Sequence, residues 1–149
     1  MTESRFQYVT YIKATPEALW EALTSPEAMK TYFFGLPFEA EWKVGGSWRR
    51  LFPDGALMTE GNILEIAPPS RLVISWRNAE SEKKAEGFIR CVMEVEAIDT
   101  AAKLTVTHSI GVANSKLISA VAQAWPQVLS NLKTFLETGG VALTVPSRK

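Results

Sequence analysis

The sequence KLISAVAQAWPQVLSNLKTFLE, residues 116–137, decides the fold class of this chain. Its large apolar residues recur at steps of three and four, which places them on one broad face of a long helix. Pro126 falls inside this pattern and is expected to kink the helix or to restart it. Gly139 and Gly140 fit the C-terminal end of the helix. A helix with so wide an apolar face needs a large apolar surface to cover it, and the rest of the chain must supply that surface.

Most of the chain before this helix has the alternating pattern of strands. Apolar and polar residues alternate over residues 5–13, 47–52, 58–66, 72–76, 87–98 and 103–110, with turn signals between several of these segments. Thr15-Pro16 and Ser25-Pro26 each combine a capping residue with a proline, which predicts two short helices after the first strand. This order indicates an α+β fold in which a curved antiparallel sheet of six to seven strands grips the C-terminal helix.

The composition excludes several classes of function. The 149 residues suit a single domain, which we expect to span residues 1–140 before a short tail at 141–149. Sixteen basic residues balance sixteen acidic ones, so no general attraction to nucleic acid is expected. The single His and the single Cys exclude a disulfide within the chain and the usual Cys/His zinc site. We therefore expect no metal, no cofactor and no nucleic-acid partner.

The N-terminal residues and the lone cysteine bear on localisation. Residues 1–7 are polar and lack the hydrophobic region of a signal peptide. No apolar run approaches the ~20 residues that a membrane-spanning helix needs. An unpaired cysteine agrees with a reducing compartment. The sequence thus predicts a cytoplasmic protein that does not span a membrane.

The parity of strand pairing predicts which side chains face the helix. In the last hairpin, an odd sum of paired residue numbers places Cys91, Met93 and His108 on one apolar face. The same argument places Trp76 of the preceding strand on that face. The predicted inner surface is therefore apolar, with His108 as a rare polar group.

The orientation of the strand over residues 58–66 is less determined. An even sum across the turn at Pro68-Pro69 brings Leu64 and Asn62 inward, and Glu60 with them, unless a bulge intervenes. Glu60 has two interpretations, both with Arg49 as its neighbour across the strands. On the inner face of the sheet, the pair would anchor a polar ligand group. On the outer face, which we favour, it is a surface ion pair that contributes about 0–1 kcal/mol to stability.

An apolar inner surface with few polar groups is typical of a small-molecule site. The candidate ligand-binding residues are Phe33, Phe34, Phe38, Trp48, Asn62, Trp76, Met93, His108, Trp125 and Leu129. Each also has a structural interpretation, because large aromatic side chains dominate core packing and a strand histidine is commonly hydrogen-bonded. A nucleophilic pair of Cys91 and His108 would need an orienting third group, which the sequence does not identify. No catalytic residue is therefore assigned.

Several short motifs follow one another in the order and spacing of a known family. They are ATPEALWEALT at 14–24, VGGSW at 44–48, Glu60-Gly61, PPSRL at 68–72 with Ser75-Trp76, TVTH at 105–108, and Trp125 with Leu129 and Leu132. With these motifs the chain resembles the activator-of-heat-shock-protein-90-ATPase homologue-like family, within the START-like, birch-pollen-allergen-like superfamily. The resemblance covers about residues 6–137 and implies a helix-grip fold with a cavity between sheet and helix. The sequence departs from the family at Ala124, where a glycine is usual, and at Pro126.

The resemblance leaves three functions open. Relatives in the superfamily bind lipids, sterols or polyketides, so the first expectation is binding of a small hydrophobic molecule in the cavity. The family name implies an alternative, a co-chaperone module that activates the ATPase of heat-shock protein 90. The third is an enzyme, such as a cyclase or hydrolase, that uses His108 or Glu60. The expected partner is a small hydrophobic ligand or a chaperone, and the expected state is a monomer or a homodimer.

Overall fold

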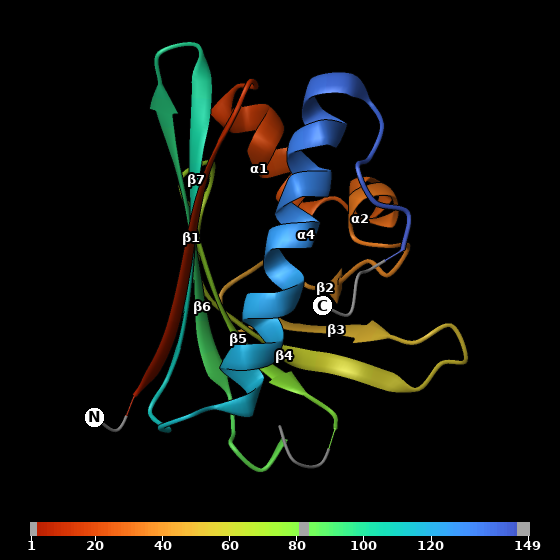
Figure 1. Ribbon diagram of the computed structural model, residues 1–149, viewed down its shortest axis with the longest axis vertical. Coiled ribbons are helices and arrows are strands. Elements are labelled where there is room, and N and C mark those ends of the chain that lie inside the picture. Colours follow the sequence, from red (N-terminus) through yellow and green to blue (C-terminus); the bar gives the residue numbers. More distant parts are fainter. Residues whose placement is uncertain (1–2, 81–83, 146–149) are drawn as a thin grey trace.

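The long helix lies across one face of a curved antiparallel sheet, as the sequence predicts (Figure 1). The computed structural model describes residues 3–80 and 84–145. Its elements in chain order are β1 (Ser4–Ile12), α1 (Pro16–Thr24), α2 (Pro26–Tyr32), β2 (Glu39–Ala40), β3 (Ser47–Leu51), β4 (Leu57–Ala67), β5 (Arg71–Asn78), β6 (Ile89–Ile98), β7 (Ala101–Ile110) and α4 (Lys116–Thr138). The seven strands of these described segments form one sheet in the order β1-β7-β6-β5-β4-β3-β2. This is the expected helix-grip arrangement.

Side-chain caps explain where the two short helices begin. Oγ1 of Thr15 accepts a hydrogen bond from the Ala18 amide at 3.1 Å, and Oγ of Ser25 accepts one from the Ala28 amide at 3.3 Å. A proline follows each cap at the start of the helix, where its missing N–H is not needed. Both predicted helices are confirmed, and they lie beside the C-terminal half of α4 (Figure 1).

The helix α4 is continuous through Pro126, so the proline does not restart it. Oγ of Ser115 caps its first turn by accepting from the Ile118 amide at 3.0 Å, and Gly139 ends it in the left-handed conformation with a φ of 86°. The buried residues of the predicted apolar face are Leu117, Ile118, Val121, Trp125, Val128, Leu129 and Leu132. In the parts of the chain that the structure describes, no helix combines the length and apolarity needed to cross a membrane.

The predicted faces of the last three strands are confirmed. Cys91 lies opposite His108 in the β6–β7 pair, and Trp76 lies opposite Ile89 in the β5–β6 pair. These four side chains and Met93 are buried between the sheet and α4. The inner face is thus apolar over β5, β6 and β7, with His108 within it.

The predicted inward orientation of Asn62 and Leu64 is wrong. A β-bulge shifts the β4–β5 register between Ile63 and Glu65, so that Ile63 instead of Leu64 faces the core. One extra residue in a strand reverses the alternation of all residues beyond it. Asn62 and Leu64 are consequently exposed on the outer face, and Glu60 lies on that face with them.

The chain segment after α4 is held to the core by one buried side chain. Nδ2 of Asn131 donates to the Leu143 carbonyl at 2.9 Å, and Oδ1 accepts from the Leu143 amide at 2.8 Å. The same Nδ2 donates to the carbonyl of Tyr32 at the end of α2, at 3.3 Å. Asn131 therefore joins α2, α4 and the segment that follows α4. The domain limit at residue 140 stays a prediction, and residues 146–149 of the predicted tail lie outside the described part of the chain.

Candidate functional site

The space between the sheet and α4 around Trp125 is filled by aromatic side chains. The rings of Phe38 and Trp48 stack with centroids 4.4 Å apart, and Trp48 lies 4.8 Å from Trp76. Phe33 meets Trp125 edge-on at 5.8 Å. The void left in this region is only about 10 Å³. This aromatic interior is therefore packed core, with no room for a ligand in the structure as it stands.

His108 is sealed within the aromatic interior. It is 0% exposed, its ring centroid lies 5.1 Å from that of Trp125, and neither ring nitrogen has a hydrogen-bond partner among the described residues. Burial lowers the pKa of the imidazole to about 3, so the ring is neutral at physiological pH. Burial likewise raises the pKa of the Cys91 thiol opposite it. The two side chains face each other in register, but both are neutral and shut off from solvent.

An opening lies near the middle of α4, where that helix passes over β3, β4 and β5. Two neighbouring pockets of about 170 Å³ and 230 Å³ share five lining residues, and we call them the mouth pockets. The shared residues are Phe33, Arg50, Met58, Ala124 and Val128. The first pocket adds Thr59, Trp76, Asn78, Ala120, Val121 and Trp125, and the second adds Phe34, Leu36, Gln123 and Gln127. Their walls are mostly apolar, which is the usual character of a small-molecule site.

Three polar side chains form a row across the sheet at the first mouth pocket. Arg50 on β3 pairs with Thr59 on β4, and Thr59 pairs with Asn78 on β5. All three line this pocket, so strand pairing alone brings them together. We call them the polar row. It supplies the few convergent polar groups that give an apolar pocket its specificity.

Arg50 is the charged member of the polar row and is only 6% exposed. Its Nε donates to the Leu36 carbonyl at 2.8 Å, and its guanidinium lies 4.0 Å from the centre of the Phe33 ring, a cation–π contact. Among the residues that the structure describes, no carboxylate forms an ion pair with it. Burial lowers the pKa of the guanidinium to about 10, which leaves it charged at neutral pH. The mouth therefore holds a buried positive charge for which the described residues supply no counter-charge.

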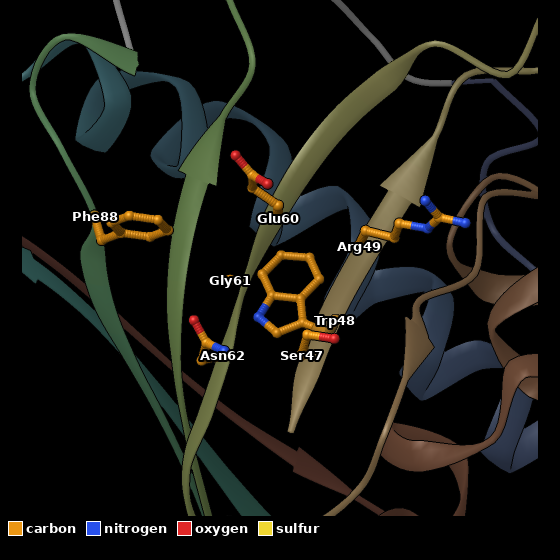
Figure 2. A pocket seen from close by; sticks show the side chains of 7 residues that line it. All are labelled: Ser47, Trp48, Arg49, Glu60, Gly61, Asn62 and Phe88. Atoms are coloured by element: carbon orange, nitrogen blue, oxygen red, sulfur yellow. The ribbon is translucent and has the colours of Figure 1, made fainter. Parts of the chain in front are cut away.

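A third pocket lies on the outer face of the sheet and has a volume of about 290 Å³ (Figure 2). Its floor is Gly61, over which the indole of Trp48 reaches across to β5. The indole Nε1 donates to the Ser75 carbonyl at 2.9 Å, and a Cβ on Gly61 would lie only 1.8 Å from that oxygen. Glycine is required here because a Cβ would collide with this carbonyl oxygen and with the indole nitrogen of Trp48. Asn62 and Phe88 form the other walls, with Phe88 beside the strands as Figure 2 shows.

The favoured outer placement of Glu60 is confirmed, but its ion-pair partner differs from the expected one. Arg49 and Glu60 face each other in register on β3 and β4. The ion pairs are nevertheless Glu60 with Arg77 at 2.5 Å and Arg49 with Glu39 at 3.0 Å. Glu60 and His108 lie on opposite faces of the sheet, so the two residues named for an enzyme cannot act on one substrate together.

Nine of the ten predicted ligand-binding residues fall into three groups, and His108 lies apart from them. Phe33, Phe34, Trp76 and Trp125 line the mouth pockets. Phe38, Met93 and Leu129 border the 10 Å³ void of the aromatic interior. Trp48 and Asn62 line the outer pocket, and His108 borders neither mouth pocket. Whether any of these residues contacts a ligand stays a prediction.

The polar row was missed by sequence reasoning. A signal for Arg50 exists, because it stands two residues after Trp48 on the same strand and so shares its inward face. No comparable signal exists for Thr59, whose orientation depends on the bulge in β4. Within residues 3–80 and 84–145, no group of three or more His, Cys, Asp or Glu side chains is placed to hold a metal ion.

Comparison with known proteins agrees with this architecture. A family model described as "Activator of Hsp90 ATPase homolog 1-like protein" matches residues 13–137. Among solved structures, CalU16 from Micromonospora echinospora is 19% identical with a TM-score of 0.72, over 91% of this chain and 77% of that one. The Aha1 dimer from Colwellia psychrerythraea is 19% identical with a TM-score of 0.74, over 91% and 98% of the two chains. An HSP90 activator from Plasmodium falciparum is 20% identical with a TM-score of 0.74, over 89% and 96%. No curated protein matches the sequence.

Proposed function

The chain belongs to the Activator of Hsp90 ATPase homolog 1-like family, and from this premise we propose that it binds a small, mostly apolar molecule in the mouth pockets. The observation that carries the proposal is the pair of adjoining pockets beneath the middle of α4. Together their volumes fall in the lower part of the range of about 300–1,000 Å³ that is typical of small-molecule sites. The rest of the space between sheet and helix is packed, so the mouth is where a ligand would enter.

The walls of the mouth suit an apolar ligand. Phe33, Met58 and Val128 line both pockets, and Trp76 and Trp125 line the first. Burying apolar surface of a ligand against them contributes about 25 cal/mol per Å² before the entropy of binding is subtracted. The two tryptophans also provide a signal, since a ligand against an indole changes its fluorescence.

Filling the mouth tests the proposal. Ala124 lines both pockets and is exposed, so Ala124→Phe would occupy their volume without disturbing the core. Ser119→Phe is the matched control, because it places the same side chain on an exposed position of α4 that borders neither pocket. The neutral probes 1-decanol and 1-naphthalenemethanol are titrated by calorimetry and by tryptophan fluorescence.

The wild type and Ser119→Phe are expected to bind at least one probe with the same affinity. Ala124→Phe is expected to bind it at least about tenfold more weakly, a change of about 1.4 kcal/mol. Absence of binding by the wild type to either probe would contradict the proposal. Equal binding by Ala124→Phe and the wild type would show that the ligand enters elsewhere.

A chaperone-associated role is the second candidate, and the family match favours it. The structure from Plasmodium falciparum, described as an HSP90 activator, shares this fold over 96% of its length. The test is the ATPase rate of purified heat-shock protein 90 with and without this chain. A stimulated rate that survives Ala124→Phe would support a docking surface outside the mouth, and an unchanged rate would contradict the role.

A further inference from the structure

The polar row carries an inference about the chemistry of the ligand, and this inference rests on the proposed function. We propose that the ligand of the mouth pockets is an amphipathic monocarboxylate, whose carboxylate binds Arg50 with the help of Thr59 and Asn78 while its apolar body lies against Phe33 and Val128.

The first step is the missing counter-charge. Buried charged groups in proteins are usually paired, because removing an ion from water costs several kcal/mol. Arg50 is almost fully buried, yet its hydrogen bond to the described residues comes from Nε alone and goes to a neutral carbonyl. Its two terminal nitrogens remain for a further acceptor. Arg50 lines both mouth pockets, so its side chain borders the space where a ligand would supply that acceptor.

The second step is independent of the charge. Oγ1 of Thr59 is buried and has no hydrogen-bond partner among the described residues, and the Thr59 residue is 3% exposed. Buried hydroxyl groups are hydrogen-bonded in the large majority of cases, so an unpartnered hydroxyl on a residue that lines a pocket indicates an absent partner. The pocket that Thr59 lines is the first mouth pocket, and its strand neighbour there is Arg50.

The third step is the direction of the hydrogen bonds. Oδ1 of Asn78 already accepts from Nε1 of Trp76 at 3.0 Å, which leaves the amide Nδ2 as its donor. The guanidinium of Arg50 can only donate, and the hydroxyl of Thr59 can donate as well. The polar row therefore offers donors along its length, and the matching ligand group is one that only accepts. An ionised carboxylate is such a group.

The fourth step selects a carboxylate over a phosphate. Arg50 is the only Lys or Arg among the described residues that line the two mouth pockets, so the site supplies one positive charge. A carboxylate carries one negative charge and matches the two terminal nitrogens of a guanidinium in a bidentate pair. A phosphate monoester carries between one and two charges at neutral pH and would leave part of its charge unpaired.

The experiment compares probes that share an apolar body and differ in the polar end. Decanoate, 1-decanol and decyl phosphate are titrated against the wild type by calorimetry at neutral pH, where the decanoate carboxyl is ionised. Decanoate is expected to bind roughly tenfold or more tightly than 1-decanol, because its carboxylate makes charge-assisted hydrogen bonds. Binding of decyl phosphate as tight as that of decanoate would overturn the choice of a carboxylate.

Two neighbouring arginines provide matched variants. Arg50→Met removes the buried charge and keeps an apolar stem, and it should lose the preference for decanoate while it still binds 1-decanol. Arg49→Met removes an exposed charge on the outer face, one residue away, and should keep the preference. Arg50→Lys keeps the charge without the two-pronged geometry, and an intermediate preference is expected. Circular dichroism and a cooperative melting curve establish that each variant is folded.

A failure of the carboxylate inference can be distinguished from a failure of the proposed function. Should wild type bind decanoate and 1-decanol equally, or should Arg50→Met keep the preference for decanoate, the carboxylate inference is overturned and the proposed function stands. If wild type binds none of the three probes, the proposed function fails and the inference fails with it. Loss of the preference in Arg49→Met as well would assign the effect to the overall charge and overturn a role for Arg50.

Discussion

The aromatic interior around His108 and the mouth around Arg50 lie on the same face of the sheet, and each buries a polar side chain. The two side chains differ in their charge at neutral pH. His108 has no hydrogen-bond partner in the described part of the chain and is surrounded by aromatic rings, and burial lowers its pKa to about 3. Arg50 is almost as buried, but its pKa falls only to about 10, so it keeps its charge. One region holds a neutral polar group in packed core, and the other holds a charge beside open volume.

The comparison shows that burial by itself does not identify a functional residue. A histidine can escape the penalty of burial by losing its proton, because its usual pKa is close to neutral. An arginine cannot do so at neutral pH, and its buried charge therefore needs a partner. Arg50, which keeps its charge and lines a pocket, is therefore a better candidate for ligand binding than His108. The following predictions test the two regions, from the largest expected effect to the smallest.

The aromatic interior should make the protein sensitive to acid through His108. Above about pH 6.5 the imidazole is neutral in both the folded and the unfolded chain, so it does not make stability depend on pH there. As the pH falls toward 3, the unfolded chain binds a proton that the folded chain cannot, and folding stability falls by up to about 1.4 kcal/mol per pH unit. The expected loss from this residue between about pH 6.5 and pH 3.5 is about 4 kcal/mol.

Urea unfolding of the wild type and His108→Leu across this pH range measures the effect. The carboxylates with lowered pKa, such as Glu65 and Glu137, are present in both proteins, so the difference between the two isolates the histidine. His108→Leu should lose much less stability in acid. An identical acid response in both proteins would show that the imidazole is protonated in the folded state.

Gly61, which lies between the outer pocket and the indole of Trp48, should not tolerate a side chain. Gly61→Ala places a methyl group against the Ser75 carbonyl and the indole of Trp48, which must move. The expected loss of stability is about 3 kcal/mol by thermal or urea unfolding. Gly111→Ala is the control, since a Cβ there meets nothing within 4 Å, and its change should be far smaller. Similar losses for both variants would contradict the close approach at Gly61.

The ligand-free protein should become more stable when the buried charge of Arg50 at the mouth is removed. Arg50→Met eliminates a buried charge that has no counter-charge among the described residues, at the loss of one hydrogen bond and of the cation–π contacts with Phe33 and Phe38. We expect a gain of about 2 kcal/mol in the free energy of unfolding of the ligand-free protein. Arg49→Met should change it by less than about 1 kcal/mol, because its ion pair is exposed. Destabilisation by Arg50→Met would assign Arg50 to folding instead of binding.

The smallest effect is expected at Thr59. Thr59→Val keeps the shape of the side chain and removes a buried hydroxyl that no described residue hydrogen-bonds. Stability should rise by about 1 kcal/mol in the ligand-free protein. Thr107→Val is the control, because the hydroxyl of Thr107 accepts from Gln7 on the outer face. A loss of stability in Thr59→Val would mean that the hydroxyl is satisfied, and the polar row would lose one member.

Sequence patterns were sufficient for most of the fold. The two Thr/Ser-Pro signals located α1 and α2, because capping and the geometry of proline act within a few residues. Strand parity placed Cys91, His108 and Trp76 correctly, since the β5–β6 and β6–β7 pairs are antiparallel and have no register shift. It failed at Asn62, because a bulge leaves no clear mark in a sequence.

The sequence by itself determined the helix-grip architecture and the inward face of its last three strands, because helical and strand periodicity are local properties of the chain. Only the tertiary structure decided where the space between sheet and helix is filled and where it is open. That division depends on how Phe33 and Phe38 pack against three tryptophans that are far apart in the sequence. These are Trp48, Trp76 and Trp125. It also depends on the pairing of β3, β4 and β5, which brings Arg50, Thr59 and Asn78 into one row. Such contacts join residues far apart in the chain, and no local pattern encodes them.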